Sequence, residues 1–400
     1  KNDWGRLDMT SKWNQFALGE IIELVIDYRG KTPKKLGGDW CKQGYRALSA
    51  KNIKTGRIVQ AETIRYIDES LYRKWMKNEV QHGDILITSE APFGQIFFWD
   101  SDEKIVLSQR LFCVRIKPEY DARFIYYYMT TPEFQSELDG RATGTTVIGL
   151  RQPELMKCVI QCPEIQEQKV IAAILSSIDE KIIANEKVND NLQQQAAALF
   201  SSLYDRSNTE VRFTDLIQIL GGGTPKTGEN TYWNGNIAFF TPKDVGTPYT
   251  LITEKTISKE GLSHCNSRLY PVNTVFVTAR GTVGKVGMSG VPMAMNQSCY
   301  ALVGKETHQL LVYFYTLKAV DRLKHKASGA VFDAITTRDF ESEQIMKLSD
   351  DDATAFLRVA EPMFQEILNN NIENLRLSTL RDSLLPKLMS GEIDVSAVQL

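Results

Sequence analysis

The chain has 400 residues, of which 42% are hydrophobic, so it can hold two or three domains with a core in each. Its formal net charge of −2 argues against a uniformly basic nucleic-acid coat, although it leaves room for local basic loops. No run of 18 apolar residues occurs, so no membrane segment is predicted, and the six cysteines and four histidines show no zinc-site spacing. Scattered cysteines without a visible signal peptide predict a reduced, cytoplasmic protein.

The first predicted region, residues 1–163, is a β-rich domain. Short apolar runs bounded by glycine and proline predict strands at 84–88, 95–99 and 110–116. An apolar stretch at 124–129 predicts a short helix after them.

A long amphipathic helix is predicted for residues 164–206. Its apolar residues recur every three or four positions among charged and amide residues, which is the narrow seam that a coiled coil requires. The predicted helix-pairing residues of this segment are Ile171, Ile174, Ile178, Ile182, Leu192, Leu199 and Leu203.

Residues 207–350 repeat the order of the first domain. Strands are predicted at 274–278, 285–288 and 300–303, and a helix is predicted at 310–324.

Residues 351–400 predict a second long helix and a tail. Pro362 lies inside this helix, so a kink is predicted near it. The predicted helix-pairing residues are Phe356, Val359, Met363, Ile367, Leu375, Leu384 and Leu388.

The length of these two helices bears on how they pack. A helix of about 40 residues is roughly 60 Å long, which exceeds the width of a globular half of this size. Antiparallel pairing of the two seams accounts for this length better than the alternative, in which each helix packs on its own domain. The predicted fold is therefore α+β, with two similar domains separated by an antiparallel pair of long helices and related by pseudo-two-fold symmetry.

The loops of the two halves also match in sequence and in order. Residues 29–34 correspond to 221–226, and residues 49–53 correspond to 241–245. A period near half the chain length is too long for a solenoid and indicates a duplicated domain. A duplicated domain provides one polypeptide with two similar but non-identical binding faces.

The sequence lacks the common motifs of catalysis. The glycine-rich stretch at 221–228 suggests a phosphate loop, but Glu229 and Asn230 follow it where the Walker pattern needs Lys-Ser/Thr. No G-x-S-x-G, H-E-x-x-H, G-x-G-x-x-G or Asn/Asp-Pro-Pro-Tyr/Phe motif occurs. We therefore predict a protein that binds rather than catalyses, with no catalytic residues, no metal and no cofactor of its own.

The matching loops carry basic, amide and hydroxyl side chains. Lys and Arg can neutralise phosphates, and Asn, Gln and Arg have the paired groups that read adenine or guanine edges. For any single residue, a solvated turn remains the alternative. The candidate DNA-binding residues of the first half are Arg29, Lys31, Thr32, Lys34, Lys35, Lys51, Asn52, Gln109, Arg110, Thr143, Thr145, Thr146 and Arg151. Those of the second half are Thr224, Lys226, Lys243, Asp244, Arg280, Thr282, Asn296, Gln297, Ser328, Thr336, Thr337 and Arg338.

Two helical segments carry a family resemblance. The run Glu-Gln-Lys-Val-Ile-Ala-Ala-Ile-Leu-Ser-Ser-Ile-Asp-Glu-Lys-Ile at 167–182 resembles the central region of type I restriction-modification specificity subunits, and so does the ending at 384–393. Trp13 with residues 18–21, and residues 223–226, resemble the starts of that family's two target recognition domains. The resemblance covers almost the whole chain.

The resemblance implies a function for each region. Residues 1–163 and 207–350 would be target recognition domains, each reading one part of a split sequence in double-stranded DNA. The helices at 164–206 and 351–400 would set the gap between the two parts and dock two methyltransferase subunits, which hold S-adenosylmethionine and methylate adenine. A restriction subunit, where present, would cleave DNA with ATP and Mg. The chain itself would be non-catalytic alone.

Two alternatives stay open at this point. The first is the equivalent subunit of a related system in which modification and cleavage are fused on one partner. The second, of a different class, is a coiled-coil scaffold whose duplicated heads bind protein or RNA.

Overall fold

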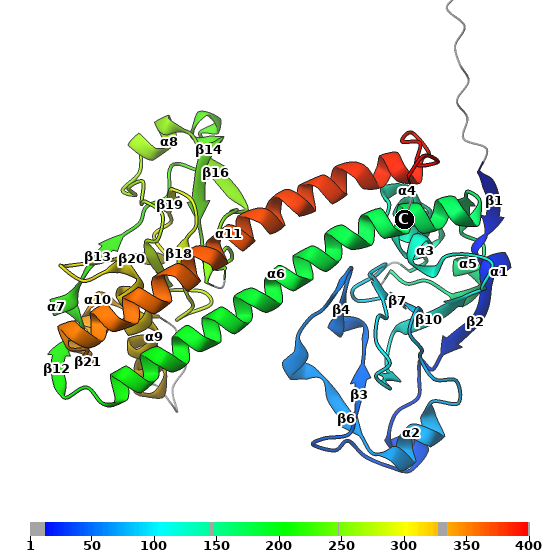
Figure 1. Ribbon diagram of the computed structural model, residues 1–400, viewed down its shortest axis with the longest axis horizontal. Helices are drawn as coiled ribbons and strands as arrows, with labels where there is room; N and C mark the ends of the chain where they lie inside the picture. The colour runs from blue at the N-terminus through cyan, green and yellow to red at the C-terminus, as the bar shows by residue number, and fades with distance from the viewer. Residues whose placement is uncertain (1–12, 145–147, 247, 327–333, 399–400) are drawn as a thin grey trace, which may run out of the picture. The chain divides into compact units, whose positions relative to one another are not determined.

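The computed structural model describes residues 13–144, 148–246, 248–326 and 334–398. The chain separates into two compact units, one made of residues 1–180 with 377–400 and the other of residues 181–376. Each unit therefore contains one β-rich domain and a segment of each of the two long helices (Figure 1).

The first domain is built on a four-stranded antiparallel sheet. Its order is β2 (Ile22–Asp27), β10 (Leu111–Ile116), β7 (Ile85–Thr88) and β8 (Ile96–Phe98). The strands predicted at 84–88, 95–99 and 110–116 are confirmed as β7, β8 and β10. The helix predicted at 124–129 is confirmed within α3 (Ala122–Met129).

Both faces of this sheet are buried, because successive side chains of a strand point to opposite faces. Ile85 and Ile87 of β7 pack in one core with Phe124 of α3. Leu86, which lies between them, packs in a second core with Trp75. The sheet therefore separates two hydrophobic layers, and β7 is buried throughout.

A second, smaller sheet lies in the second of these cores and was not predicted from the sequence. Its order is β6 (Arg65–Ile67), β3 (Tyr45–Leu48) and β9 (Val106–Leu107), with β3 antiparallel to β6 and parallel to β9. The other elements of the first domain are β1 (Asn14–Ala17), α1 (Leu18–Ile21), η1 (Lys34–Leu36), η2 (Ala50–Asn52), β4 (Ile53–Lys54), β5 (Arg57–Ile58), η3 (Ala61–Thr63), α2 (Glu69–Trp75), α4 (Pro132–Arg141), α5 (Gln152–Leu155) and β11 (Val159–Cys162).

The second domain repeats this plan with one more strand in the main sheet. The main sheet has the order β13 (Ile217–Gly221), β20 (Cys299–Gly304), β17 (Val275–Thr278), β18 (Val286–Ser289) and β15 (Tyr249–Thr250). The strands predicted at 274–278, 285–288 and 300–303 and the helix predicted at 310–324 are confirmed as β17, β18, β20 and α9 (Gln309–Lys326).

The small sheet also recurs in the second domain. Its order is β16 (Lys255–Ile257), β14 (Trp233–Phe240) and β19 (Met293–Met295), again with one antiparallel and one parallel pair around the middle strand. The other elements of this domain are β12 (Thr209–Arg212), α7 (Phe213–Leu216), η4 (Asn230–Tyr232), α8 (Lys259–Ser263), α10 (Thr337–Ser342) and β21 (Gln344–Lys347).

The two long helices are α6 (Ile165–Asp205) and α11 (Asp350–Met389), each continuous (Figure 1). In the unit of the first domain, Ile171 and Leu175 of α6 share a core with Leu388 of α11. Asp179 Oδ1 accepts a hydrogen bond from Arg381 Nη1 at 2.7 Å, and Asp179 Oδ2 accepts one from the Tyr127 hydroxyl at 2.7 Å.

In the unit of the second domain, the other ends of the helices meet in the same way. Phe200 of α6 stacks on Phe314 of α9 and contacts Phe356 of α11 edge-on. An ion pair joins Arg206 and Asp352 at 2.6 Å. The end of α6 therefore contacts the beginning of α11 in the second unit, and the beginning of α6 contacts the end of α11 in the first unit. This order is antiparallel. The helices pack both on each other and on a domain, so the two packing modes weighed from the sequence coexist.

Between these apolar ends the helix contact is polar. Asn185 Nδ2 donates to Asn374 Oδ1 at 2.8 Å, Asn189 Nδ2 donates to Asn371 Oδ1 at 2.9 Å, and Asn370 Nδ2 donates to Asn189 Oδ1 at 2.9 Å. Asn185, Asn189 and Asn370 are buried. A buried amide layer specifies register, because a shift of either helix would leave these groups unpaired.

One expectation about α11 needs correction. Val359 and Leu375, predicted in the pairing seam, keep 41% and 37% of their surface exposed, since the buried stripe runs through Phe356, Ala360 and Ile367. The other predicted helix-pairing residues are buried or half-buried. The helix continues through Pro362, which lacks the N–H that would bond to the carbonyl of residue 358, and the kink expected there stays a prediction. Residues 358 and 362 are both exposed, so water can hydrate the carbonyl of residue 358.

Within the described ranges, no helix combines the length and apolar character needed to cross a lipid bilayer.

Candidate nucleic-acid interface

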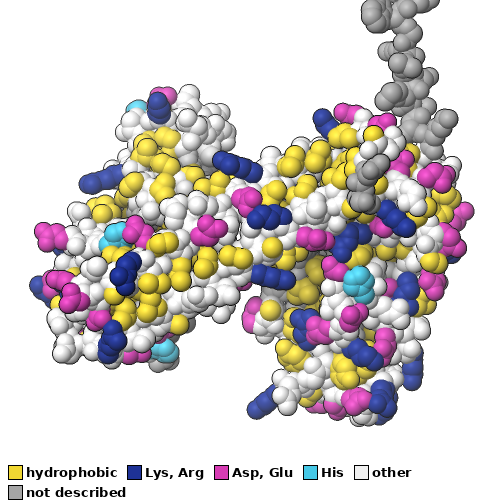
Figure 2. All heavy atoms as spheres, in the orientation of Figure 1, with side chains coloured by type: hydrophobic (Ala, Val, Ile, Leu, Met, Phe, Trp, Pro, Cys, Tyr) yellow, Lys and Arg dark blue, Asp and Glu magenta, His cyan; other side chains and the backbone are white. Residues whose placement is uncertain are grey.

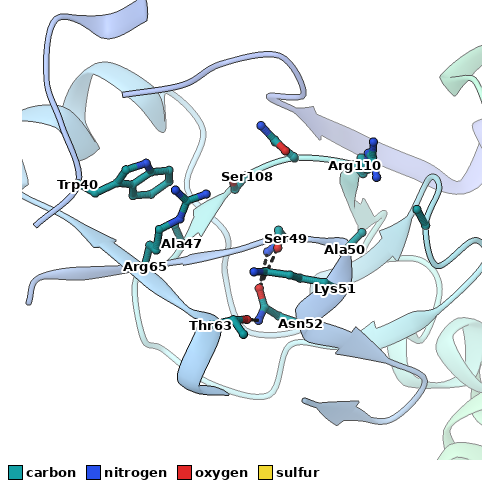
Figure 3. Close-up of a pocket in the computed structure, with 12 residues that line it drawn as sticks. Trp40, Ala47, Ser49, Ala50, Lys51, Asn52, Thr63, Arg65, Ser108 and Arg110 are labelled. Carbon is teal, nitrogen blue, oxygen red and sulfur yellow. Dashed lines mark hydrogen bonds between the residues drawn. The ribbon is translucent and has the colours of Figure 1, made fainter. Parts of the chain in front are cut away.

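The first domain has a pocket of about 200 Å³ where β3 ends and where β9 runs into β10 (Figure 3). Backbone hydrogen bonds join the two segments, from Ser108 N to Leu48 O at 2.8 Å and from Ala50 N to Gln109 O at 3.1 Å. The pocket is called the first pocket below. It is lined by Trp40, Ala47, Ser49, Ala50, Lys51, Asn52, Thr63, Arg65, Ala91, Ser108, Gln109 and Arg110.

Asn52 forms the support of the first pocket. Its Oδ1 accepts from Ser49 N at 3.1 Å and Ser49 Oγ at 2.9 Å, and its Nδ2 donates to Thr63 Oγ1 at 3.0 Å and Gln60 O at 3.3 Å. The side chain is 1% exposed. Because its polar atoms already have partners, Asn52 holds the loop in shape and is not placed to contact a ligand, contrary to the expectation from sequence.

Cations form the rim of the first pocket. Lys51, Gln109 and Arg110 are exposed, as predicted for ligand contacts. Arg110 Nε pairs with Glu90 Oε1 at 2.9 Å, and half of the arginine side chain remains exposed. Arg65, which the sequence did not single out, adds a third cation, with its guanidinium carbon 4.1 Å from the centre of the Trp40 ring.

Two residues of this pocket have strained backbone conformations. Arg110 has φ = 62° and Ala91 has φ = 44°, in the left-handed region that non-glycine residues rarely adopt. The hydrogen bond from Ser89 N to Arg110 O at 2.9 Å holds the arginine in place. Such strain of about 1–3 kcal/mol per residue persists where the surrounding structure imposes it, and it is concentrated at functional sites.

Several other predicted residues of the first half are engaged inside the domain. Arg29 pairs with Asp27 at 2.8 Å and lies 3.9 Å above the Phe112 ring. Lys31 Nζ donates to Trp75 O at 2.8 Å, and burial, together with the nearby Lys77 charge, lowers the pKa of Lys31. These two side chains anchor the loop after β2 rather than reach the pocket.

The remaining predicted residues of the first half lie outside the first pocket. Lys35 Nζ donates to Gly30 O at 2.8 Å, and Thr32 Oγ1 accepts from Lys35 N at 3.3 Å. Lys34, Thr143 and Arg151 are exposed. Thr145 and Thr146 fall outside the described residues.

The second domain has a pocket at the corresponding place, of about 520 Å³, which is called the second pocket below. It lies where β14 ends and beside the segment after β19. It is lined by Thr241, Pro242, Lys243, Glu254, Lys255, Gly281, Thr282, Lys285 and Asn296.

Asp244 supports the second pocket as Asn52 supports the first. Asp244 Oδ2 accepts from Thr241 N at 2.8 Å and Thr241 Oγ1 at 2.6 Å, and Oδ1 accepts from Glu254 N at 2.7 Å. In both domains an acceptor three residues ahead closes the loop on a Ser or Thr. Asp244 is therefore also a loop-holding residue, although the sequence suggested a DNA contact.

The charges at the second pocket mirror those at the first. Lys243, Lys255 and Lys285 line it, and Glu254 lies 3.5 Å from Lys243. The three lysines and one glutamate that line the second pocket leave a net charge of +2, and the three cations that line the first pocket leave +3. Glu90, which pairs with Arg110, and Asp244, which supports the second pocket, lower these values to +2 in the first pocket and +1 in the second. Figure 2 shows basic and acidic side chains mixed over the visible surface, in keeping with the overall charge of −2, so the positive character is local.

The other predicted residues of the second half divide in the same way. Thr282 Oγ1 donates to Pro242 O at 3.2 Å, and Asn296 Oδ1 accepts from Ser298 N at 3.0 Å. Both residues line the second pocket, and these hydrogen bonds hold them to neighbouring loop residues. Thr224 is hydrogen-bonded to Gln297. Thr336 caps α10. Lys226, Arg280, Thr337 and Arg338 are exposed, and Ser328 falls outside the described residues.

Sequence reasoning missed Arg65, Glu254, Lys255 and Lys285. Arg65 and Lys255 share a Thr-x-Arg/Lys-x-Ile pattern at 63–67 and 253–257, which is a signal that could have identified them. The residues reach the pockets through strand pairing in the small sheets and through the β17–β18 turn. Among the described residues, no group of three or more His, Cys, Asp or Glu side chains is arranged to hold a metal ion.

A family model described as the type I restriction modification DNA specificity domain matches residues 10–194 and 206–347, which together make up most of the chain. The chain belongs to this family. The two matched regions coincide with the two halves that share the pocket architecture.

Relatives and one solved structure agree with this membership. The type I restriction enzyme MjaIX specificity subunit of Methanocaldococcus jannaschii is 22% identical, with 83% of this chain and 82% of that protein covered. The type I restriction enzyme HindI specificity subunit of Haemophilus influenzae is 23% identical, with 79% and 88% covered. The crystal structure of a type I restriction-modification S subunit from M. genitalium superposes with a TM-score of 0.60 at 16% identity, covering 96% of this chain and 98% of that one, which shows a common fold.

Proposed function

We propose that this chain is the specificity subunit of a type I restriction-modification system and that each of its domains recognises one part of a split duplex DNA sequence. One observation carries the proposal. Each domain has a pocket with an equivalent support and a net positive charge, in a chain with an overall charge of −2. Local positive charge attracts the phosphate backbone, and amide or guanidinium groups beside it can read bases.

The residues proposed to read bases are those that the two domains do not share. Gln109-Arg110 in the first domain corresponds to Gln297-Ser298 in the second. Arg110 Nε lies 2.9 Å from Glu90 Oε1 while half of the side chain stays exposed, and a guanidinium can pair with guanine O6 and N7. The proposal assigns different bases to the two half-sites because the chemistry at this position differs.

The long helices are proposed to set the gap between the half-sites and to dock methyltransferase subunits. Each helix begins in one unit and ends in the other, so its length is the structural quantity that a gap would depend on. The exposed apolar side chains Ile183, Val188 and Leu380 lie on these helices and suit a protein partner. S-adenosylmethionine would then be held by that partner, and ATP with Mg by a restriction subunit where one is present.

The test uses the chain together with its methyltransferase partner. Methylated adenines are mapped across a genome with and without this gene, and a duplex carrying the mapped sequence is then compared with a random duplex in a gel-shift assay. The expected result is a split methylation motif that disappears with the gene, and tighter binding of the mapped duplex. Equal binding of both duplexes, with no gene-dependent motif, would reject the proposal in favour of a scaffold that binds protein or RNA.

A further inference from the structure

The small sheet of each domain places one cation at an equivalent position. Arg65 of β6 pairs with Ala47 of β3, and Lys255 of β16 pairs with Phe239 of β14. Ala47 and Phe239 both lie two positions before the Ser or Thr that opens the supported loop. Arg65 and Lys255 are therefore equivalent in the duplicated fold, and the flanking sequence agrees, because Thr63 and Ile67 correspond to Thr253 and Ile257 at the same spacing.

Each of these cations also lies over an indole ring. The Arg65 guanidinium carbon is 4.1 Å from the centre of the Trp40 ring, and Lys255 Nζ is 5.6 Å from that of Trp233. Both cations are exposed and both line their pockets. An aromatic face attracts the charge and restricts the side chain while leaving its N–H groups free to donate outward.

Arginine and lysine share only part of their chemistry. A guanidinium can make two parallel hydrogen bonds to a guanine edge, whereas an ammonium is a compact point charge. A role common to both positions must be one that both groups can perform, and neutralising a phosphate is such a role. The 5.6 Å separation in the second domain positions a charge without fixing hydrogen-bond directions, which also favours a phosphate.

We propose that Arg65 and Lys255 are a matched pair of phosphate anchors, one for each half-site, positioned by Trp40 and Trp233. The proposal rests on the proposed function and adds a division of labour to it. Positions where both domains have a cation orient each domain on the DNA backbone whatever the sequence. Positions where the domains differ, Arg110 and Ser298, select the bases.

The salt dependence of binding tests the anchors. Affinity of the chain with its methyltransferase partner for a duplex carrying the mapped target is measured between about 50 and 200 mM salt. Each neutralised phosphate contributes about 0.9 to the slope of log affinity against log salt. Arg65→Ala and Lys255→Ala are each expected to reduce the slope by about one unit, and the double variant by about two. Over this range the wild type should weaken about 3- to 4-fold more than either single variant.

Four controls accompany this measurement. Arg65→Lys keeps the charge and should keep the wild-type slope. Lys74→Ala and Lys259→Ala remove exposed cations of the same two domains that do not line a pocket, and their slopes should not change. The methylated motif should be the same for every variant, and urea unfolding midpoints verify that each variant is folded.

Different outcomes separate the anchors from the proposed function. An unchanged slope in Arg65→Ala and Lys255→Ala would overturn the anchors, and so would relaxed selection at one base position. Arg65→Lys behaving like Arg65→Ala would also overturn them, because it would show that fork geometry and not charge matters. If the wild-type complex binds the mapped duplex no more tightly than a random duplex at every salt concentration measured, the proposed function itself fails.

Discussion

The first and second pockets differ in the side chains at their rims far more than in the framework beneath them. Asn52 and Asp244 close equivalent loops on Ser49 and Thr241 with the same pattern of hydrogen bonds. Arg110, by contrast, corresponds to Ser298, and the pocket volumes are about 200 and 520 Å³. After duplication, side chains whose hydrogen bonds shape a loop tolerate little change, whereas exposed rim side chains can vary without loss of folding.

The largest effect is expected from shortening the helix pair, because the two domains that recognise the half-sites are joined by these helices. Removing residues 181–184 of α6 together with 376–379 of α11 deletes about one turn from each helix between the Asp179–Arg381 and Asn185–Asn374 contacts. Four residues correspond to about 6 Å of helix, so the gap in the methylated motif should change by about one to two base pairs while both half-sites stay the same. Methylation mapping would show this, and an unchanged gap would mean that the helices do not set it.

Exchanging the two loop-supporting residues tests the shared framework. Asn52→Asp removes the donors to Thr63 Oγ1 and Gln60 O and buries a carboxylate, so it should lower the free energy of unfolding by about 2–4 kcal/mol. Asp244→Asn keeps one acceptor oxygen and should lower it by about 1 kcal/mol. Urea unfolding measures both. Equal losses would show that the two loops are not held in the way described.

Arg110 tests the variable part of the comparison. Arg110→Ala should weaken binding by about 1–3 kcal/mol, or roughly 5-fold to 160-fold, and should relax the motif only in the half-site read by the first domain. Ser298→Ala is the matched change in the second domain and should leave the first half-site untouched. The measurement is methylation mapping with binding titrations of half-site variants. Relaxation of both half-sites by Arg110→Ala would contradict independent reading.

The asparagine layer of the helix pair should show the smallest effect. Asn189→Leu leaves Asn370 and Asn371 without their partner and should lower the free energy of unfolding by about 1 kcal/mol. Asn189→Leu combined with Asn370→Leu should recover that loss but allow the helices to shift, so that targets with neighbouring gap lengths also become methylated. A double variant that keeps one unique gap would show that the apolar ends alone define the register.

Much of the fold could be predicted because local periodicity encodes it. Short apolar runs in residues 84–88 and 274–278 identified the buried central strands, and the three- and four-residue spacing in α6 identified the long helix. The small sheets escaped prediction because β9 has only two residues, and because β14 carries asparagine and glycine residues among its apolar ones, which obscure the strand pattern. The stripe on α11 was placed partly wrongly at Val359 and Leu375, since spacing alone does not select which of two adjacent apolar rows faces the partner.

The candidate site was harder to predict because exposure is decided by partners that are distant in sequence. Lys31 and Lys51 look alike as basic loop residues, yet the Lys31 ammonium donates to the carbonyl of Trp75, 44 residues away, while Lys51 stays exposed at the first pocket. Arg29, Asn52 and Asp244 were likewise predicted to contact DNA, and their polar groups are used within the domain.

By itself, the sequence determined the duplication, the fold class and the long helices, because these depend on the order of residue types along the chain, on short apolar runs and on a period of three to four residues. Only the tertiary structure decided which cations are free to meet a ligand. Strand register and loop closure brought Arg65 over Trp40 and Lys255 towards Trp233, and they paired other basic residues with carbonyls and carboxylates from remote segments. Hydrogen bonds and ion pairs act over a few ångströms in space, and no spacing along a chain specifies such contacts.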